Sequence, residues 1–236
     1  MQRTLERVRE TALRSDALPE RWLDGLDDRV QNFGEICRVV MHSHNIVVHV
    51  SGALPGSRSV VMSNHLSYLD PLIISAFVPA VPIAKSEVEA WPIVGPAAQR
   101  FGVLFTQRTR PEQGATVLRC CLRALDRGVS ILNFPEGTTS FGETVLPLKR
   151  GLFGIARRAQ APVVPTVLRF EDRAMCWVGD QGFIPHYAGL LRREQTVTHL
   201  AFGDPIPPQN FDSPEALRDA TRNAMMALRR SHFGER

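Results

Sequence analysis

The sequence predicts an α/β fold: a single domain in which helices flank a central, mostly buried mixed sheet, preceded by N-terminal amphipathic helices. From residue 46 onward, short β-branched runs alternate with longer segments of helical periodicity, the pattern of an α/β layer fold. Apolar residues make up 44% of the 236 residues and charged residues 22%, so a sizeable core is available and global disorder is excluded. No linker or shift in composition divides residues 46–236, and we expect one domain there.

Residues 1–45 are expected to form two amphipathic helices divided at Pro19, because apolar residues recur at helical spacing between charged ones. The simplest interpretation is a pair of helices that pack on the domain. The alternative is an arm at a membrane interface, with Trp22 and Phe33 in lipid.

The remaining elements follow in order along the chain. Strands are expected at residues 46–50, 59–63, 81–84, 103–106, 129–133, 163–168 and 196–202. Helices are expected at residues 71–78, 112–127, 151–159 and 214–232. The last helix has the clearest start, because Ser213 can cap it and Pro214 suits its first turn.

The motifs that identify several classes of enzyme are missing. The sequence lacks the G-x-S-x-G nucleophile elbow, the phosphate-binding P-loop, the dinucleotide-binding G-x-G-x-x-G and the zinc-binding H-E-x-x-H, and it shows no metal ligand set. The four cysteines have no C-x-x-C spacing and are expected to be free thiols. A net charge of +4 with dispersed arginines indicates no nucleic-acid partner. We expect neither a secretory signal nor a membrane span.

His65 and Asp70 follow the strand expected at 59–63, and α/β proteins tend to place their sites at the rim of the sheet. A spacing of five residues would put them about 140° apart around one ideal helix. The two side chains can therefore meet only if His65 lies in the turn between strand and helix and Asp70 lies in the first turn of the helix. The carboxylate could then hold one imidazole nitrogen and leave the other free as a general base. Taken alone, such a pair is structural more often than catalytic.

A second candidate segment, Phe-Pro-Glu-Gly-Thr-Thr-Ser at residues 134–140, follows the strand expected at 129–133. Gly137 and Thr138 offer backbone N–H groups and a hydroxyl to an anion. Glu136 would repel phosphate unless it binds a cation or a hydroxyl. A capped turn without a function explains the segment equally well.

Two further cations stand beside expected elements: Arg108 follows the strand at 103–106, and Lys149 precedes the helix at 151–159. An arginine at a strand end is usually solvated. A cation at a helix N-terminus opposes the helix dipole. This placement suggests an anionic partner, or it has no function.

Taken together and in this order, these segments resemble the glycerolipid acyltransferase family, typified by 1-acylglycerol-3-phosphate O-acyltransferase. The motif N-H-x-x-x-x-D is matched by Asn64, His65 and Asp70, and G-x-x-F-x-x-R by Gly102, Phe105 and Arg108. The motif F-P-E-G-T-R-S is matched from Phe134 to Ser140 except at Thr139, where the family usually has Arg. An apolar strand ending around Pro165, the K-x-E-L-like segment at Lys85 and the K-x-G at Lys149 also fit.

The resemblance implies direct acyl transfer from a thioester donor, acyl-CoA or acyl carrier protein, to a hydroxyl of a lysolipid, with no other cofactor. It implies that His65 is the general base and Asp70 orients it, and that the substrate-binding residues are Arg108, Glu136, Gly137, Thr138, Lys85 and Lys149. The family resemblance implies that the acceptor is 1-acylglycerol-3-phosphate or a related lysolipid. The motif with Thr139 resembles that of the branch that acylates lyso-ornithine lipids. A non-catalytic lipid-binding accessory protein on the same fold is the alternative.

A lysolipid acceptor further implies a membrane surface as partner. We expect a cytoplasmic protein, peripheral on the inner face of the membrane, whose N-terminal helices and apolar residues 71–82 lie at the interface.

Overall fold

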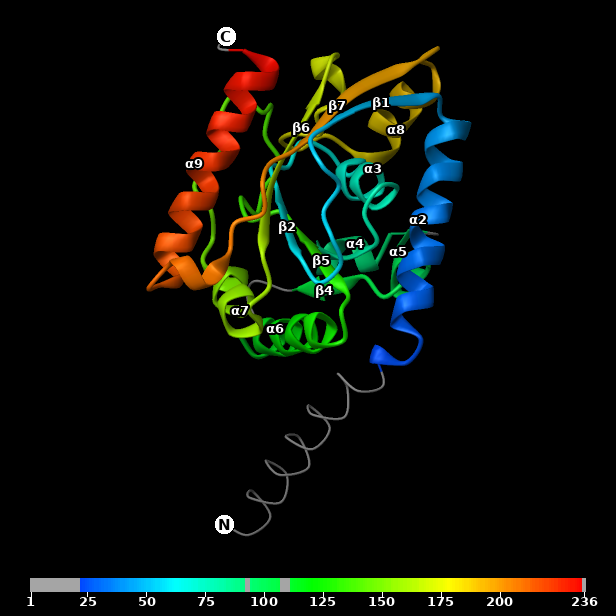
Figure 1. Cartoon of the computed structure of the whole chain (residues 1–236). Helices are drawn as coiled ribbons and strands as arrows, with labels where there is room; N and C mark the ends of the chain where they lie inside the picture. The colour runs from blue at the N-terminus through cyan, green and yellow to red at the C-terminus, as the bar shows by residue number, and fades with distance from the viewer. Residues whose placement is uncertain (1–21, 92–93, 107–110, 235–236) are drawn as a thin grey trace.

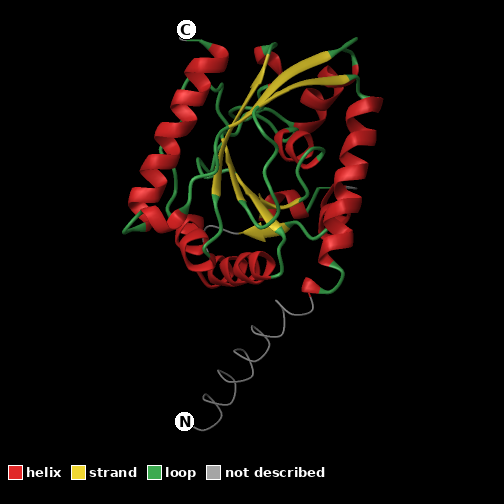
Figure 2. Ribbon diagram, in the orientation of Figure 1, coloured by secondary structure: helices red, strands yellow, loops and turns green. Residues whose placement is uncertain are grey.

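The computed structural model describes residues 22–91, 94–106 and 111–234, which form one α/β domain (Figure 1). A single sheet of seven strands runs through its centre, and helices cover both faces (Figure 2). The strands are β1 (Ile46–Ser51), β2 (Val60–Ser63), β3 (Ala80–Lys85), β4 (Leu104–Thr106), β5 (Ser130–Asn133), β6 (Val163–Phe170) and β7 (Thr196–Phe202). All seven strands predicted from the sequence are confirmed.

The strand order is β1-β7-β6-β2-β5-β3-β4. Neighbouring strands are parallel except for the antiparallel pair β6–β7, so the sheet is mixed, as predicted. β2 is a central strand: Val60 pairs with Val163 of β6 on one side and with Ile131 of β5 on the other. All four residues of β2 are buried, as expected for a strand covered on both faces.

Among the described residues, the helices longer than one turn are α2 (Leu26–Ser43), α3 (Asp70–Ser75), α5 (Val94–Arg100), α6 (Pro111–Asp126), α7 (Gly151–Ala159), α8 (Phe183–Leu191) and α9 (Pro214–Phe233). The shorter ones are α4 (Ser86–Glu89), η1 (Arg173–Met175) and η2 (Pro208–Asn210). The four helices predicted beyond residue 46 are confirmed as α3, α6, α7 and α9. In α9, the Ser213 side chain accepts a hydrogen bond from the N–H of Ala216, which confirms the predicted cap.

Two hydrophobic cores lie on opposite faces of the sheet, because successive residues of a strand point to opposite sides. Val60 and Met62 of β2 belong to the core under α6, α7 and α9, whereas Val61 belongs to the core under α3 and α8. α2 contributes to both cores: Val30 lies in the first and Phe33 in the second.

Two expectations about a lipid-facing surface are wrong for the described residues. Residues 71–82 include most of α3 and the first half of β3, and Ile73, Ile74 and Val81 are at most 1% exposed. Phe33 is 8% exposed and packs against Phe101 with ring centroids 5.7 Å apart. α2 therefore packs on the domain, while the helix expected before Pro19 lies outside the described residues. No helix in the described part of the chain combines the length and apolar character needed to cross a bilayer.

Candidate active site

The candidate site lies where β2 and β5 end, side by side and parallel. The chain leaves β2 through α3, whose Ile73 packs in one core, and leaves β5 toward α7, whose Phe153 packs in the other. The two connections therefore pass to opposite faces of the sheet. Open α/β sheets bind their ligands at the carboxyl ends of the strands where the connections diverge in this way. His65 follows β2 at this edge, and Glu136 follows β5.

His65 and Asp70 form a hydrogen-bonded pair, as the sequence predicted. His65 Nδ1 lies 2.7 Å from Asp70 Oδ2, with the histidine in the turn and the aspartate as the first residue of α3. The carboxylate can only accept, so Nδ1 carries the proton and Nε2 keeps its lone pair in the neutral ring. The His65 side chain is 21% exposed and that of Asp70 is fully buried. The pair therefore has one end open to a substrate and one end fixed in the protein.

Backbone groups stabilise the buried Asp70 carboxylate. Oδ2 also accepts hydrogen bonds from the N–H groups of Leu66 at 2.6 Å and Ser67 at 2.9 Å. Hydrogen bonds to the ionised form offset the cost of burying a charge. The same bonds hold the turn that carries His65.

Three further contacts fix this turn from outside. The His65 carbonyl accepts from the N–H of Ser140 at 2.9 Å, and the Leu66 carbonyl accepts from the N–H of Trp177 at 2.7 Å. The His65 ring stacks on Phe134 with centroids 4.3 Å apart. His65 is thus held in place before any substrate binds, which is the condition for efficient proton transfer.

Asn64 attaches the turn to the neighbouring strand. Its amide donates to the Leu168 carbonyl at 2.9 Å and accepts from the Leu168 N–H at 2.7 Å, and the residue is 4% exposed. We expect Asn64→Ala to lower the free energy of unfolding by about 2–4 kcal/mol, because both backbone groups of Leu168 lose a partner in the interior. Urea denaturation measures this loss, with the exposed Asn210→Ala as control. Equal midpoints for the two variants would contradict it.

Glu136 lies beneath the turn with both oxygens bound to backbone. Oε2 accepts from the N–H of His65 at 3.2 Å and Oε1 from the N–H of Leu146 at 2.9 Å. The side chain is 5% exposed, and burial raises the pKa of its carboxyl, which the two backbone hydrogen bonds partly offset. These contacts support a positioning role for Glu136; binding of a substrate hydroxyl stays a prediction from the sequence.

Glu136→Gln tests this positioning role. The amide keeps the size of the side chain but turns one acceptor into a donor that faces a backbone N–H, so His65 or Leu146 loses its partner. We expect kcat to fall about ten- to a hundredfold with little change in KM, because a small displacement of a catalytic group is costly. Exposed Glu143, which pairs with Arg173 on the surface, provides the control Glu143→Gln. An unchanged kcat in Glu136→Gln would exclude the positioning role.

The structure places four of the other predicted site residues at or near the same edge. Gly137, with φ of 72°, and exposed Thr138 follow Glu136. Exposed Lys85 is the last residue of β3, the other neighbour of β5. The backbone N–H of Lys149 bonds to the Pro135 carbonyl at 2.8 Å. Arg108 lies outside the described residues, two positions beyond the end of β4.

The chain offers no activated cysteine here. All four cysteines are buried and free, and burial raises the pKa of Cys176 to about 11 and that of Cys37 to about 12. A thiol with such a pKa is protonated at neutral pH and is a poor nucleophile. Within the described residues, no three His, Cys, Asp or Glu side chains gather to hold a metal ion.

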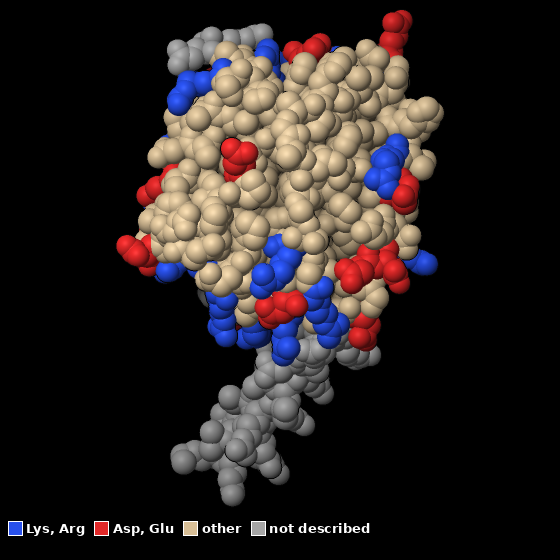
Figure 3. Space-filling model, viewed as in Figure 1, with Lys and Arg blue, Asp and Glu red and all other residues tan. Residues whose placement is uncertain are grey.

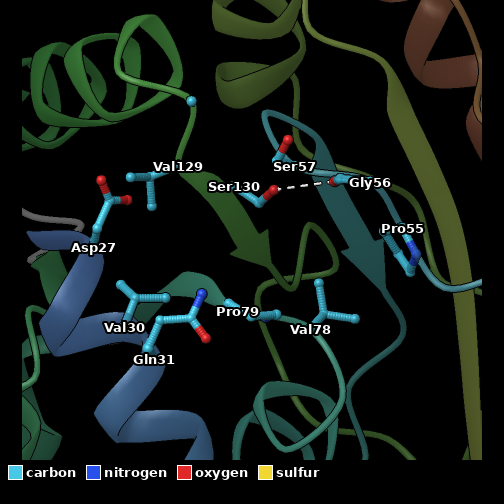
Figure 4. A pocket seen from close by; sticks show the side chains of 11 residues that line it. Asp27, Val30, Gln31, Pro55, Gly56, Ser57, Val78, Pro79, Val129 and Ser130 are labelled. Carbon is cyan, nitrogen blue, oxygen red and sulfur yellow. Dashed lines mark hydrogen bonds between the residues drawn. The ribbon is translucent and has the colours of Figure 1, made fainter.

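A cavity of about 220 Å³ lies at the opposite edge of the sheet, between α2 and the starts of β2 and β5 (Figure 4). Asp27, Val30 and Gln31 line it from the helix, and Ser130 lines it from β5, bonding to the Gly56 carbonyl. None of the predicted site residues contributes to this cavity. This cavity is therefore separate from the candidate site at the carboxyl edge.

Comparisons with known proteins show the family to which the chain belongs. The family model described as Acyltransferase matches residues 45–169, a range that contains His65, Asp70 and Glu136. The lyso-ornithine lipid O-acyltransferase of Pseudomonas aeruginosa is 32% identical over 186 residues, covering 77% of this chain and 72% of its own. The 1-acyl-sn-glycerol-3-phosphate acyltransferase of Neisseria meningitidis is 33% identical over 158 residues, covering 66% of this chain and 60% of its own.

The crystal structure of PlsC, the 1-acyl-sn-glycerophosphate acyltransferase of Thermotoga maritima, superposes with a TM-score of 0.63 at 25% identity. The match covers 86% of this chain and 80% of that one. The chain therefore belongs to the Acyltransferase family and is an acyltransferase.

Proposed function

We propose that this protein transfers a fatty acyl group from a thioester, acyl-CoA or acyl carrier protein, to a hydroxyl of a lysolipid. The observation that carries the proposal is the His65–Asp70 pair, 2.7 Å apart between Nδ1 and Oδ2, at the carboxyl end of β2. An alcohol is a poor nucleophile at neutral pH, and a histidine held by a carboxylate can take its proton.

In the proposed reaction, Nε2 of His65 removes the hydroxyl proton as the oxygen attacks the thioester carbonyl carbon. The tetrahedral intermediate collapses, the carbon–sulfur bond breaks, and the imidazolium returns the proton to the leaving thiolate. The products are the acylated lipid and a free thiol. Asp70 stabilises the imidazolium throughout, and no acyl-enzyme forms.

The acceptor is proposed to be 1-acylglycerol-3-phosphate or a related lysolipid, the class named in the relatives above. Lys85, Lys149 and Arg108 are proposed to bind its anionic head group, with Gly137 and Thr138 contributing N–H and hydroxyl groups. No further cofactor enters this mechanism.

We also propose that the protein works on the inner face of the membrane as a peripheral enzyme. In Figure 3, lysine and arginine side chains gather at the lower edge with acidic ones among them, and the broad middle of this face is almost free of charge. Such a distribution supports a lipid partner better than a nucleic-acid partner.

The test is release of thiol from acyl-CoA and from acyl carrier protein with lysophosphatidate, other lysophospholipids and lyso-ornithine lipid as acceptors. We expect release that depends on one acceptor class, with the acylated lipid detected by mass spectrometry. Release at the same rate without any acceptor would contradict the proposal, since it would indicate hydrolysis.

A further inference from the structure

Helix α8 lies at the surface but has no charged face. Its nine residues, Phe-Ile-Pro-His-Tyr-Ala-Gly-Leu-Leu, include no lysine, arginine, aspartate or glutamate. One side packs inward, with His186 and Leu190 buried. A surface helix of a globular protein normally turns a charged face to water, and α8 has none.

The outward side of α8 carries a stripe of apolar side chains. Ile184 is 70% exposed and Leu191 is 59% exposed. They are seven residues apart, which places them within about 20° of each other around the helix. Partly exposed Ala188 lies between them on the same side. A single exposed leucine is ordinary on a protein surface, but an uninterrupted apolar stripe marks an interaction site.

Helix α8 contacts the turn that carries His65 through Tyr68. The Tyr68 hydroxyl lies 3.0 Å from His186 Nδ1, and the Tyr68 ring meets Phe183 edge to face at 5.0 Å. Trp177, whose N–H holds the Leu66 carbonyl, lies edge-on to Tyr68 at 5.7 Å. The stripe is therefore on a helix that packs directly against the turn carrying His65.

The surroundings of the stripe match a membrane interface. Partly exposed Trp91 and Trp177 flank α8, partly exposed Tyr187 belongs to it, and such amphipathic rings favour the head-group level. Exposed Arg192 follows the helix directly, and a cation there suits anionic lipid. Nine residues span about 13 Å as a helix, far less than a bilayer core, so α8 can lie in the interface without crossing it.

We propose that α8 docks this protein on the membrane, with Ile184, Ala188 and Leu191 inserted among the lipid acyl chains at the head-group boundary. This inference rests on the proposed function, because a lysolipid acceptor resides in that boundary. Docking through α8 holds the turn with His65 near the level at which a lysolipid presents its hydroxyl.

Vesicle binding of the full chain tests the docking. The double variant Ile184→Ser/Leu191→Ser removes the stripe. The control Leu54→Ser removes a 54% exposed leucine from the loop between β1 and β2, at the opposite edge of the sheet. With vesicles of phosphatidylethanolamine and phosphatidylglycerol, we expect the double variant to lose at least about tenfold in partition coefficient. Leu54→Ser should bind like the wild type. Equal losses in both variants, or none in the double variant, would overturn the proposal.

A second readout does not depend on loss of binding. Ile184→Trp places a fluorophore on the stripe, and Leu54→Trp places one at the opposite edge. Lipids brominated on their acyl chains should quench the added fluorescence in Ile184→Trp and leave it unchanged in Leu54→Trp. Equal quenching in the two variants would overturn the docking, as would a stripe that proves to bind a second copy of the chain in sedimentation.

Activity on dissolved substrates separates this inference from the proposed function. With a short-chain thioester and a short-chain lysolipid below its micellar concentration, the double variant should release thiol at the wild-type rate. If the wild type releases no thiol on any acceptor while the stripe variants still lose vesicle binding, the proposed function fails and the docking stands.

Discussion

Replacing His65 by alanine is expected to lower kcat for acceptor-dependent thiol release about 10²–10⁴-fold, the contribution of a positioned general base. KM should change little, because Nε2 meets the acceptor proton mainly in the transition state. The fold should survive, since His65 is held mainly through its backbone, by Glu136 and Ser140. Steady-state kinetics with a thiol reagent, alongside a thermal melt, measure both effects.

His49→Ala is the matched control, because exposed His49 lies on the edge strand β1, which β7 and β6 separate from β2. It should retain wild-type kinetics. If His65→Ala retained a normal kcat while remaining folded, His65 would not be the base.

Asp70→Asn is expected to lower kcat about 10²–10³-fold, because a neutral amide cannot stabilise the imidazolium that forms when His65 takes the proton. Stability should fall as well. Asp70 Oδ1 is buried without a hydrogen-bond partner among the described residues, so the new amide N–H₂ would be unsatisfied there, at a cost of about 1–3 kcal/mol.

The kinetics must therefore be measured well below the melting temperature of the variant. Asp219→Asn, on an aspartate that is 61% exposed and pairs with Arg218, controls for the change of charge. A folded Asp70→Asn with wild-type kcat would show that the carboxylate is not needed.

The strands could be predicted from the sequence because each is a short β-branched run bounded by turn residues. β2 shows this best: Val60 to Ser63 are buried on both faces, and a continuous apolar run is typical of such a strand. The helix α8 could not be predicted, since without a polar face it has no helical periodicity to detect. An apolar run such as residues 71–82 fits a lipid-facing segment and a core segment equally well by sequence, and the structure shows it to be mainly core.

The His65–Asp70 pair could be predicted because its partners lie five residues apart, within one turn and the start of one helix. The hydrogen bond from the His65 N–H to Glu136 could not be predicted, because the two residues are 71 positions apart and only the pairing of β2 with β5 brings them together. Asn64 and Leu168 are likewise 104 residues apart. Contacts between strand ends depend on the strand order, which local patterns do not contain.

A double-mutant cycle on kcat tests most directly whether His65 and Asp70 act as one unit in proton transfer. The four proteins are the wild type, His65→Ala, Asp70→Asn and the double variant, each verified as folded. If the carboxylate acts through the imidazole, Asp70→Asn should change kcat less than about threefold once His65 is absent, because residues that act as a unit are strongly non-additive. If the two losses instead multiply in the double variant, the residues act independently and the mechanism proposed for this site is wrong.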